Sequence, residues 1–198
     1  MLLFPIGLVF VFFYINIPIF GRTVDILPDA VGYVLIAVNA RRFQGKSYSF
    51  SNLVYLSGFL AVYSTLVRLI MPTGLTGIAL SLLELILQLY LLKWIVNGLE
   101  DMERIAGAHL NTDVLDRWRL LLSGVWTAVF ISVTASALAP GLTIIGLAAA
   151  AAWAVLCVLF LLTLLRTSRR YKLLVKFGPP KPDWPESDDV ETGEDGNF

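Results

Sequence analysis

Six apolar stretches, separated by short polar or proline-containing segments, dominate this sequence. A helix rises about 1.5 Å per residue, so about 20 apolar residues are needed to cross roughly 30 Å of bilayer hydrocarbon. The pattern predicts an all-α polytopic membrane protein with six transmembrane helices arranged as three hairpins. The predicted segments are residues 1–20, 26–40, 52–71, 75–96, 120–139 and 142–165.

The two N-terminal segments leave an alternative open. Segment 26–40 would reach only about 22 Å, so it either crosses a locally thinned bilayer or forms a re-entrant pair with segment 1–20. We expect segment 1–20 to be a retained helix. It has no Lys or Arg before its apolar run and no small-residue cleavage site after it, unlike a secretory signal.

The composition agrees with a membrane protein and excludes several other classes. Hydrophobic residues make up 57% of the 198 residues and charged residues 15%, whereas soluble domains contain roughly 45–50% and about 25%. The 15 Lys and Arg balance the 15 Asp and Glu, so there is no basic excess for binding nucleic acid. One Cys and one His exclude an intrachain disulfide and the usual zinc sites. We therefore expect no nucleic-acid partner, metal or cofactor.

The positions of the positive charges predict the orientation of the chain. Segments 41–51 and 97–119 each hold three Lys or Arg, and the chain from residue 166 onward holds six, whereas the two proline turns hold none. By the positive-inside rule, both termini and the two longer loops are expected in the cytoplasm.

The C-terminal residues divide into a basic and an acidic part. Residues 178–198 contain one Lys and seven acids, with several prolines, so we expect a disordered cytoplasmic tail after a bundle formed by residues 1–177. The basic run before the tail serves as a topology signal, and it also lies where anionic lipid headgroups are expected. The residues expected to contact these lipids are Arg166, Arg169, Arg170, Lys172 and Lys176.

The segment 97–119 reads as two helices rather than a loose loop. Apolar residues continue the helical period of the fourth segment as far as Ala106, Gly107 is a suitable helix stop, and Thr112 is a suitable N-cap. We expect this connector to be cytoplasmic and to offer a surface for a membrane-protein partner. Its acids and His109 are better explained as surface ion pairs than as a metal site.

The polar residues inside the apolar segments carry the functional information. An ionised side chain at mid-bilayer costs at least about 2.5–3.5 kcal/mol. Glu84 lies near the middle of segment 75–96, with Gln88 one turn further on, and Arg68 lies near the outer end of segment 52–71. Glu84 is either protonated and hydrogen-bonded, for example to Gln88, or ionised and paired with Arg68, which lies about 9 Å less deep.

Further polar residues are expected near the outer surface. Asn16 is close to the end of segment 1–20, and Asp25 and Asp29 flank Pro28 at the start of the second helix, where an acid favours the helix dipole. Arg68 either extends to the headgroups or pairs with Asp25 or Asp29. The candidate binding residues are therefore Glu84, Gln88, Arg68, Asp25, Asp29 and Asn16.

The segment DILPDAVGYVLI, residues 25–36, resembles the L/I-P-D-x-x-G-Y-x-L/I pattern of an uncharacterised family of small multi-pass membrane proteins of Gram-positive bacteria. The matching residues are Leu27, Pro28, Asp29, Gly32 and Tyr33, within about 40 residues of the chain. The resemblance implies a multi-pass protein of the bacterial plasma membrane. It implies no particular activity, but it draws attention to the last three of these residues.

Two functions fit these features. The first is a small-solute, ion or lipid carrier or channel-like protein with a site around Glu84, which predicts a polar cavity reaching that residue. The second is a non-catalytic accessory or assembly subunit of a larger membrane complex. We do not expect an enzyme, because the sequence contains no H-E-x-x-H, no G-x-S-x-G, no Gly-rich phosphate loop and no pair of intramembrane Asp residues.

Overall fold

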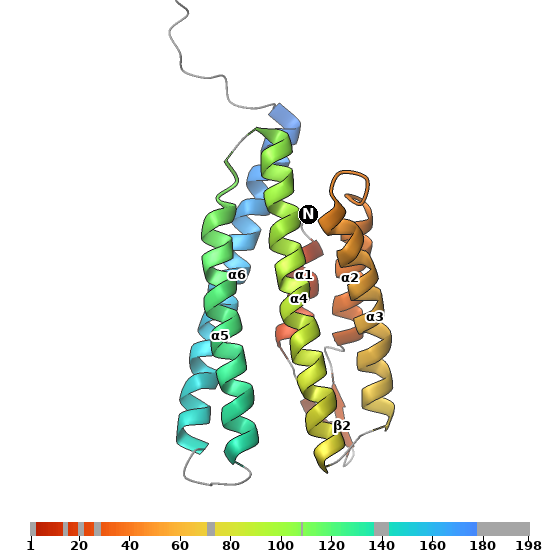
Figure 1. Ribbon diagram of the computed structural model, residues 1–198, viewed down its shortest axis with the longest axis vertical. Coiled ribbons are helices and arrows are strands. Elements are labelled where there is room, and N and C mark those ends of the chain that lie inside the picture. Colours follow the sequence, from red (N-terminus) through yellow and green to blue (C-terminus); the bar gives the residue numbers. More distant parts are fainter. Residues whose placement is uncertain are drawn as a thin grey trace, which may run out of the picture.

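A computed structural model describes residues 3–13, 16–19, 22–25, 29–70, 74–107, 109–136 and 143–177, so the predicted acidic tail lies outside the described residues. Within these ranges the chain forms helices and one short β-hairpin (Figure 1). The elements are α1 (Leu3–Phe12), β1 (Asn16–Ile19), β2 (Arg22–Asp25), α2 (Asp29–Arg41), α3 (Tyr48–Ile70), α4 (Gly74–Ala106), α5 (Thr112–Ser136) and α6 (Thr143–Phe177).

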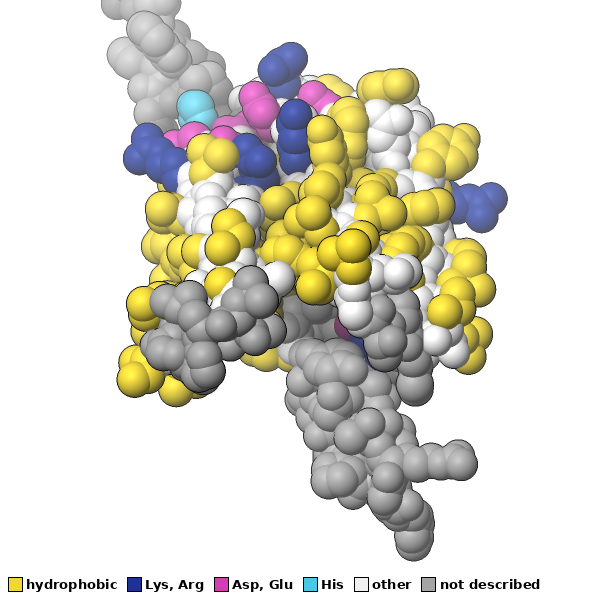
Figure 2. All heavy atoms as spheres, turned by 60° about the horizontal axis from the view of Figure 1, so that its bottom comes forward, with side chains coloured by type: hydrophobic (Ala, Val, Ile, Leu, Met, Phe, Trp, Pro, Cys, Tyr) yellow, Lys and Arg dark blue, Asp and Glu magenta, His cyan; other side chains and the backbone are white. Residues whose placement is uncertain are grey.

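Four of these helices, α3 to α6, are long and apolar enough to cross a membrane. Hydrophobic side chains cover much of the flank of the molecule, and charged side chains gather towards one end of it (Figure 2). This distribution suits a bilayer, because apolar side chains facing lipid need no polar partner whereas charged ones favour the aqueous interface. The fold is therefore helical and compatible with a membrane location.

The prediction of one helix over residues 1–20 is wrong. Helix α1 ends at Phe12, and the chain continues as an antiparallel hairpin in which Asn16 pairs with Asp25 and Ile19 with Arg22. Pro18 explains the change, because proline lacks the amide that a helix interior needs and biases the residue before it towards extended conformations. The β-branched residues around Pro18 also favour strands over helices.

Helices α1 and α2 are too short to cross the hydrocarbon layer by themselves. They contain 10 and 13 residues, which correspond to about 15 and 20 Å. The short second helix agrees with the length expected for segment 26–40. The first residue of α1 and the end of α6 lie towards the same end of the molecule, as do the α2–α3 and α4–α5 connections (Figure 1).

The two short helices cross where both have a glycine. A Cβ atom added to Gly32 would lie 2.5 Å from the carbonyl oxygen of Gly7, and one added to Gly7 would lie 2.8 Å from the carbonyl oxygen of Gly32. Both distances are far below van der Waals contact, and both neighbours are backbone atoms. The close approach of α1 and α2 therefore requires glycine at both positions.

We expect the substitution Gly32→Ala to lower the free energy of unfolding by about 2–3 kcal/mol, because the added methyl group forces the two backbones apart. Gly58→Ala in α3 is the matched control, since a Cβ there would meet no atom within 4 Å. That variant should be neutral, or more stable by up to about 1 kcal/mol. Denaturant unfolding in detergent measures both, and equal stability of the two variants would contradict the close crossing.

Aromatic packing joins the N-terminal helices to the C-terminal pair. The ring of Phe12, at the end of α1, makes edge contacts with Trp126 of α5 and with Trp153 and Phe160 of α6 at centroid distances of 5.6, 6.3 and 6.4 Å. Such edge-to-face pairs add to the stabilisation from burial. Helix α1 is therefore held between α2 on one side and the α5–α6 pair on the other.

The connector between α4 and α5 is a defined turn. Gly107 has φ 60°, in the left-handed region that ends helices. A carboxylate oxygen of Glu103 accepts hydrogen bonds from the amide of Thr112 at 3.2 Å and from its hydroxyl. The amide of Leu115 donates to the carbonyl of Asn111 at 3.4 Å, so the cap lies one residue before the predicted Thr112. In the described part of the chain, no group of three or more His, Cys, Asp and Glu could hold a metal ion.

Candidate functional site

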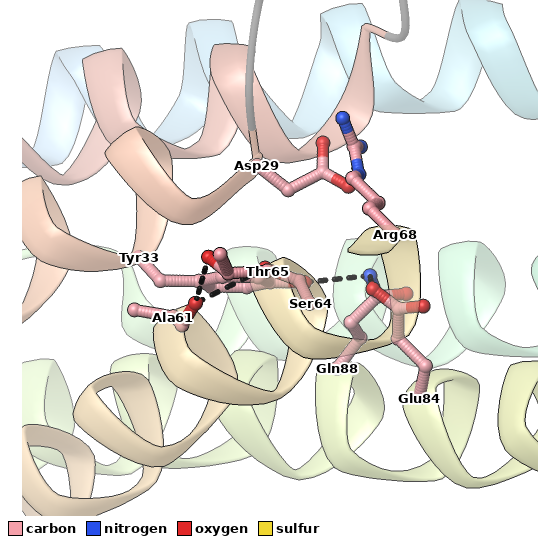
Figure 3. Close-up of polar contacts among 8 residues, drawn as sticks. All are labelled: Asp29, Tyr33, Ala61, Ser64, Thr65, Arg68, Glu84 and Gln88. Atoms are coloured by element: carbon pink, nitrogen blue, oxygen red, sulfur yellow. Dashed lines mark hydrogen bonds and ion pairs between the residues drawn. The ribbon is translucent and has the colours of Figure 1, made fainter. Parts of the chain in front are cut away.

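Helices α2, α3 and α4 bring five polar residues together. Asp29 begins α2 and Tyr33 follows one turn later, Arg68 is near the end of α3, and Glu84 and Gln88 are one turn apart in α4 (Figure 3). Four of the five carry ionisable groups, the fifth is the amide of Gln88, and all lie within otherwise apolar helices. This cluster is called the polar cluster below.

An ion pair connects the first two helices of the polar cluster. A guanidinium nitrogen of Arg68 lies 2.6 Å from a carboxylate oxygen of Asp29. The Asp29 side chain is 12% exposed and that of Arg68 33% exposed, so water screens this pair only partly. Asp29 also lies in the first turn of α2, where the helix dipole favours a negative charge. The structure thus confirms Asp29 as a partner of Arg68, one of those expected from the sequence.

A second contact joins α2 to α4. The side-chain amide of Gln88 donates a hydrogen bond to the hydroxyl oxygen of Tyr33 at 2.7 Å. Tyr33 is fully buried and Gln88 nearly so, which makes this bond shielded from competing water. Sequence reasoning named both residues but did not pair them, because the pairing depends on which faces of two helices meet.

Glu84 has the weakest partner in the polar cluster. Its carboxylate accepts a hydrogen bond from the Gln88 amide at the long distance of 3.5 Å. The same amide nitrogen also donates to the hydroxyl oxygen of Tyr33, at 2.7 Å. Glu84 is half-buried and interacts electrostatically with Arg68 and with Asp29. Two carboxyl groups therefore lie near one guanidinium group, and Glu84 keeps acceptor capacity for a further proton or cation.

The neighbouring hydroxyl groups are mostly occupied by backbone atoms. The hydroxyls of Ser64 and Thr65 both donate to the carbonyl of Ala61, at 3.4 and 2.8 Å (Figure 3). The hydroxyl of Tyr63 donates to the carbonyl of Leu80 at 2.9 Å and so links α3 to α4. These groups shape the surroundings of the cluster but offer little free hydrogen-bonding capacity.

Asn39 is a buried polar residue that sequence reasoning missed. It lies in α2, ten residues after Asp29, is completely buried, and neither polar atom of its side-chain amide has a hydrogen-bond partner among the described residues. A buried amide without partners is unfavourable. The signal for it was present, since an Asn interrupts the apolar run of the second segment.

Two of the predicted site residues, Asn16 and Asp25, pair with each other in the backbone of the hairpin. Their side chains lie outside the described part of the structure. Two surface grooves, one between α4 and α5 and one between α5 and α6, are lined by other residues, and neither includes Glu84.

No family model matches the chain, and no match was found to a curated protein or to a solved structure. The function is therefore inferred from the geometry of the polar cluster and from the chemistry of its residues.

Proposed function

We propose that the protein is a small membrane carrier or channel-like protein in which the polar cluster binds a proton or a small cation during transport. The observation that carries the proposal is the charge imbalance of the cluster. Asp29 is paired with Arg68 at 2.6 Å, whereas the hydrogen bond that Glu84 accepts among the described residues is a long one from Gln88, at 3.5 Å. A second carboxyl group inside apolar helices requires neutralisation, and a proton or cation supplies it.

The proposal includes a topology. We infer that the chain crosses the membrane as six segments, paired as three helical hairpins. Helix α1 and the β1–β2 hairpin together form the first segment, and α2 forms a short second segment. Both termini and the α4–α5 connector would be cytoplasmic, as the distribution of Lys and Arg favours. The resemblance of residues 25–36 to the bacterial family supports a location in the bacterial plasma membrane.

Asn39 would extend the path away from the cluster. It lies about 15 Å along α2 from Asp29 by helix rise. Its side-chain amide has no hydrogen-bond partner among the described residues, so it offers both a donor and an acceptor to water or a passing solute. The path would run on the inner faces of α2, α3 and α4, from the start of α2 towards its C-terminal end.

Ion flux through the purified protein tests the proposal. The full chain is reconstituted into lipid vesicles containing a pH-sensitive dye, and gradients of protons, Na⁺ and K⁺ are imposed in turn. We expect at least one gradient to collapse several-fold faster than in protein-free vesicles. Rates equal to those of protein-free vesicles for all three ions would contradict the proposal.

The connector supports the alternative, an accessory subunit of a larger membrane complex. The hydrogen bonds from Thr112 to Glu103, with His109 3.3 Å from the same carboxylate, give the α4–α5 turn a fixed shape that a partner could recognise. Purification in mild detergent distinguishes the two. Recovery as a lone, monodisperse protein without a reproducible partner would count against the subunit.

A further inference from the structure

The groove between α5 and α6 has the features of a binding site and takes no part in the polar cluster. It has a volume of about 270 Å³ and lies where the first turns of α5 pack against the C-terminal half of α6. On α6 it is lined by Leu159, Leu162, Thr163, Arg166 and Arg170, among others. Their spacing of three or four residues places them on a single helix face.

The polarity of this helix face changes along α6. It begins with leucines and ends with two arginines, over a distance of about 16 Å by helix rise. That length is about half the thickness of the hydrocarbon layer. Trp118 lines the α5 side, and tryptophan is typical of the boundary between hydrocarbon and headgroups. The groove therefore follows the polarity of one bilayer leaflet, from acyl chains to headgroups.

The two arginines at the polar end of the groove have no partner in the described part of the chain. No ion pair or hydrogen bond there involves the guanidinium group of Arg166 or Arg170. They are one turn apart, so both can approach the same anion. Guanidinium groups form paired hydrogen bonds with phosphate oxygens.

The wall of the groove is held in shape by polar contacts of its own. The hydroxyl of Thr167 donates to the carbonyl of Leu110 at 3.3 Å, which fastens α6 to the turn before α5. The hydroxyl of Thr163 donates to the carbonyl of Leu159 at 2.8 Å. A site that is already formed loses less entropy when its ligand binds.

We propose that this groove binds an anionic phospholipid of the adjacent leaflet, with the phosphate held by Arg166 and Arg170 and an acyl chain lying along Leu159 and Leu162. The groove between α4 and α5 is a weaker candidate. It also has two basic residues, Lys93 and Arg119, but the Arg119 guanidinium already donates to Asp116 at 2.7 Å.

Native mass spectrometry of the full chain in detergent tests this site. Phosphatidylglycerol and phosphatidylcholine are added at equal concentrations, and the lipid-bound fraction is measured. We expect a clear preference for phosphatidylglycerol. The double variant Arg166→Gln/Arg170→Gln should lower its affinity about 10- to 30-fold, since each charge contributes about 1 kcal/mol near a membrane surface.

The matched control is Arg41→Gln/Arg42→Gln, which removes the same charge from exposed residues at the end of α2 that do not line the groove. It should change affinity less than about twofold. The helix content of each variant, measured by circular dichroism, verifies that it folds. The variant Arg166→Lys/Arg170→Lys keeps the charge but loses paired hydrogen bonding, so it should give an intermediate loss of affinity. Equal losses in the two glutamine variants, or no preference between the lipids, would overturn the site.

A third measurement separates a lipid site from a site for free phosphate. Inorganic phosphate at millimolar concentration should leave bound phosphatidylglycerol in place, because the acyl-chain contacts with Leu159 and Leu162 are then part of the affinity. Displacement of the lipid by phosphate would show that only the anion is recognised, and it would overturn the lipid assignment. None of these outcomes depends on ion flux.

Discussion

Replacing Glu84 by glutamine is expected to slow ion flux through the reconstituted protein at least about tenfold. Glutamine keeps the size of the side chain but cannot release a proton or carry the charge that holds a cation. A hydrogen bond to a charged group contributes about 1.5–3 kcal/mol, which corresponds to about tenfold or more in binding. The measurement is the rate at which the imposed gradient collapses in vesicles containing equal amounts of protein.

The control for this variant is Glu100→Gln. Glu100 lies in the same helix, where it is exposed and 3.7 Å from Arg104 in a surface pair, so its loss should change the flux less than twofold. A Glu84→Gln protein that folds normally and transports at the unchanged rate would show that Glu84 has a structural role only. Glutamine would then satisfy the same contacts as the carboxyl group.

Removing the positive charge of the polar cluster is expected to destabilise the fold. The Arg68→Gln substitution leaves the Asp29 carboxylate, 12% exposed, without its partner. Breaking a buried ion pair costs about 3–5 kcal/mol. Because Arg68 itself is one-third exposed, we expect a smaller loss of about 2–3 kcal/mol in the free energy of unfolding. Denaturant unfolding in detergent measures it.

The double variant Asp29→Asn/Arg68→Gln identifies the source of that loss. If the ion pair is responsible, removing both charges should cost less than the sum of the two single substitutions, by about 1–2 kcal/mol. The Asn side chain can accept a hydrogen bond without the penalty of a buried charge. A loss for the double variant that equals the sum of the two single losses to within about 0.5 kcal/mol would mean that the two residues act independently.

The long helices could be predicted from the sequence because length and hydropathy are properties of a single segment. Helices α3 to α6 overlap the predicted segments 52–71, 75–96, 120–139 and 142–165. The turn between α4 and α5 could be placed as well, since Gly107 is one of the few residues in that region that adopts a positive φ without strain.

The hairpin could not be predicted from hydropathy, because an apolar strand and an apolar helix have similar composition. Pro18 was the local signal, together with the β-branched residues beside it. In the prediction, the length of the apolar run outweighed this local signal. Hydropathy therefore overestimated the length of the first helix by several residues. Asn16, which was expected near the end of that helix, lies in strand β1 instead.

The contacts within the polar cluster depend on how the helices are rotated and how closely they pack. The sequence indicates that Gln88 and Tyr33 are polar groups in apolar surroundings, but their 2.7 Å hydrogen bond requires α2 and α4 to face one another. The close crossing of α1 and α2 likewise requires glycine at Gly7 and Gly32, of which Gly7 carried no signal. Residue types could therefore be predicted, whereas most pairings could not.

The shortness of α1 and α2 has a consequence for the bilayer itself. A membrane fitted to the four long helices is thicker than these two helices can match, so lipid beside them must compress. Compression brings the headgroups and their water inward towards the start of α2, where Asp29 lies. If the protein carries ions as proposed, an ion arriving from that side would meet the carboxylate at the floor of a shallow depression, after crossing only part of the dielectric barrier.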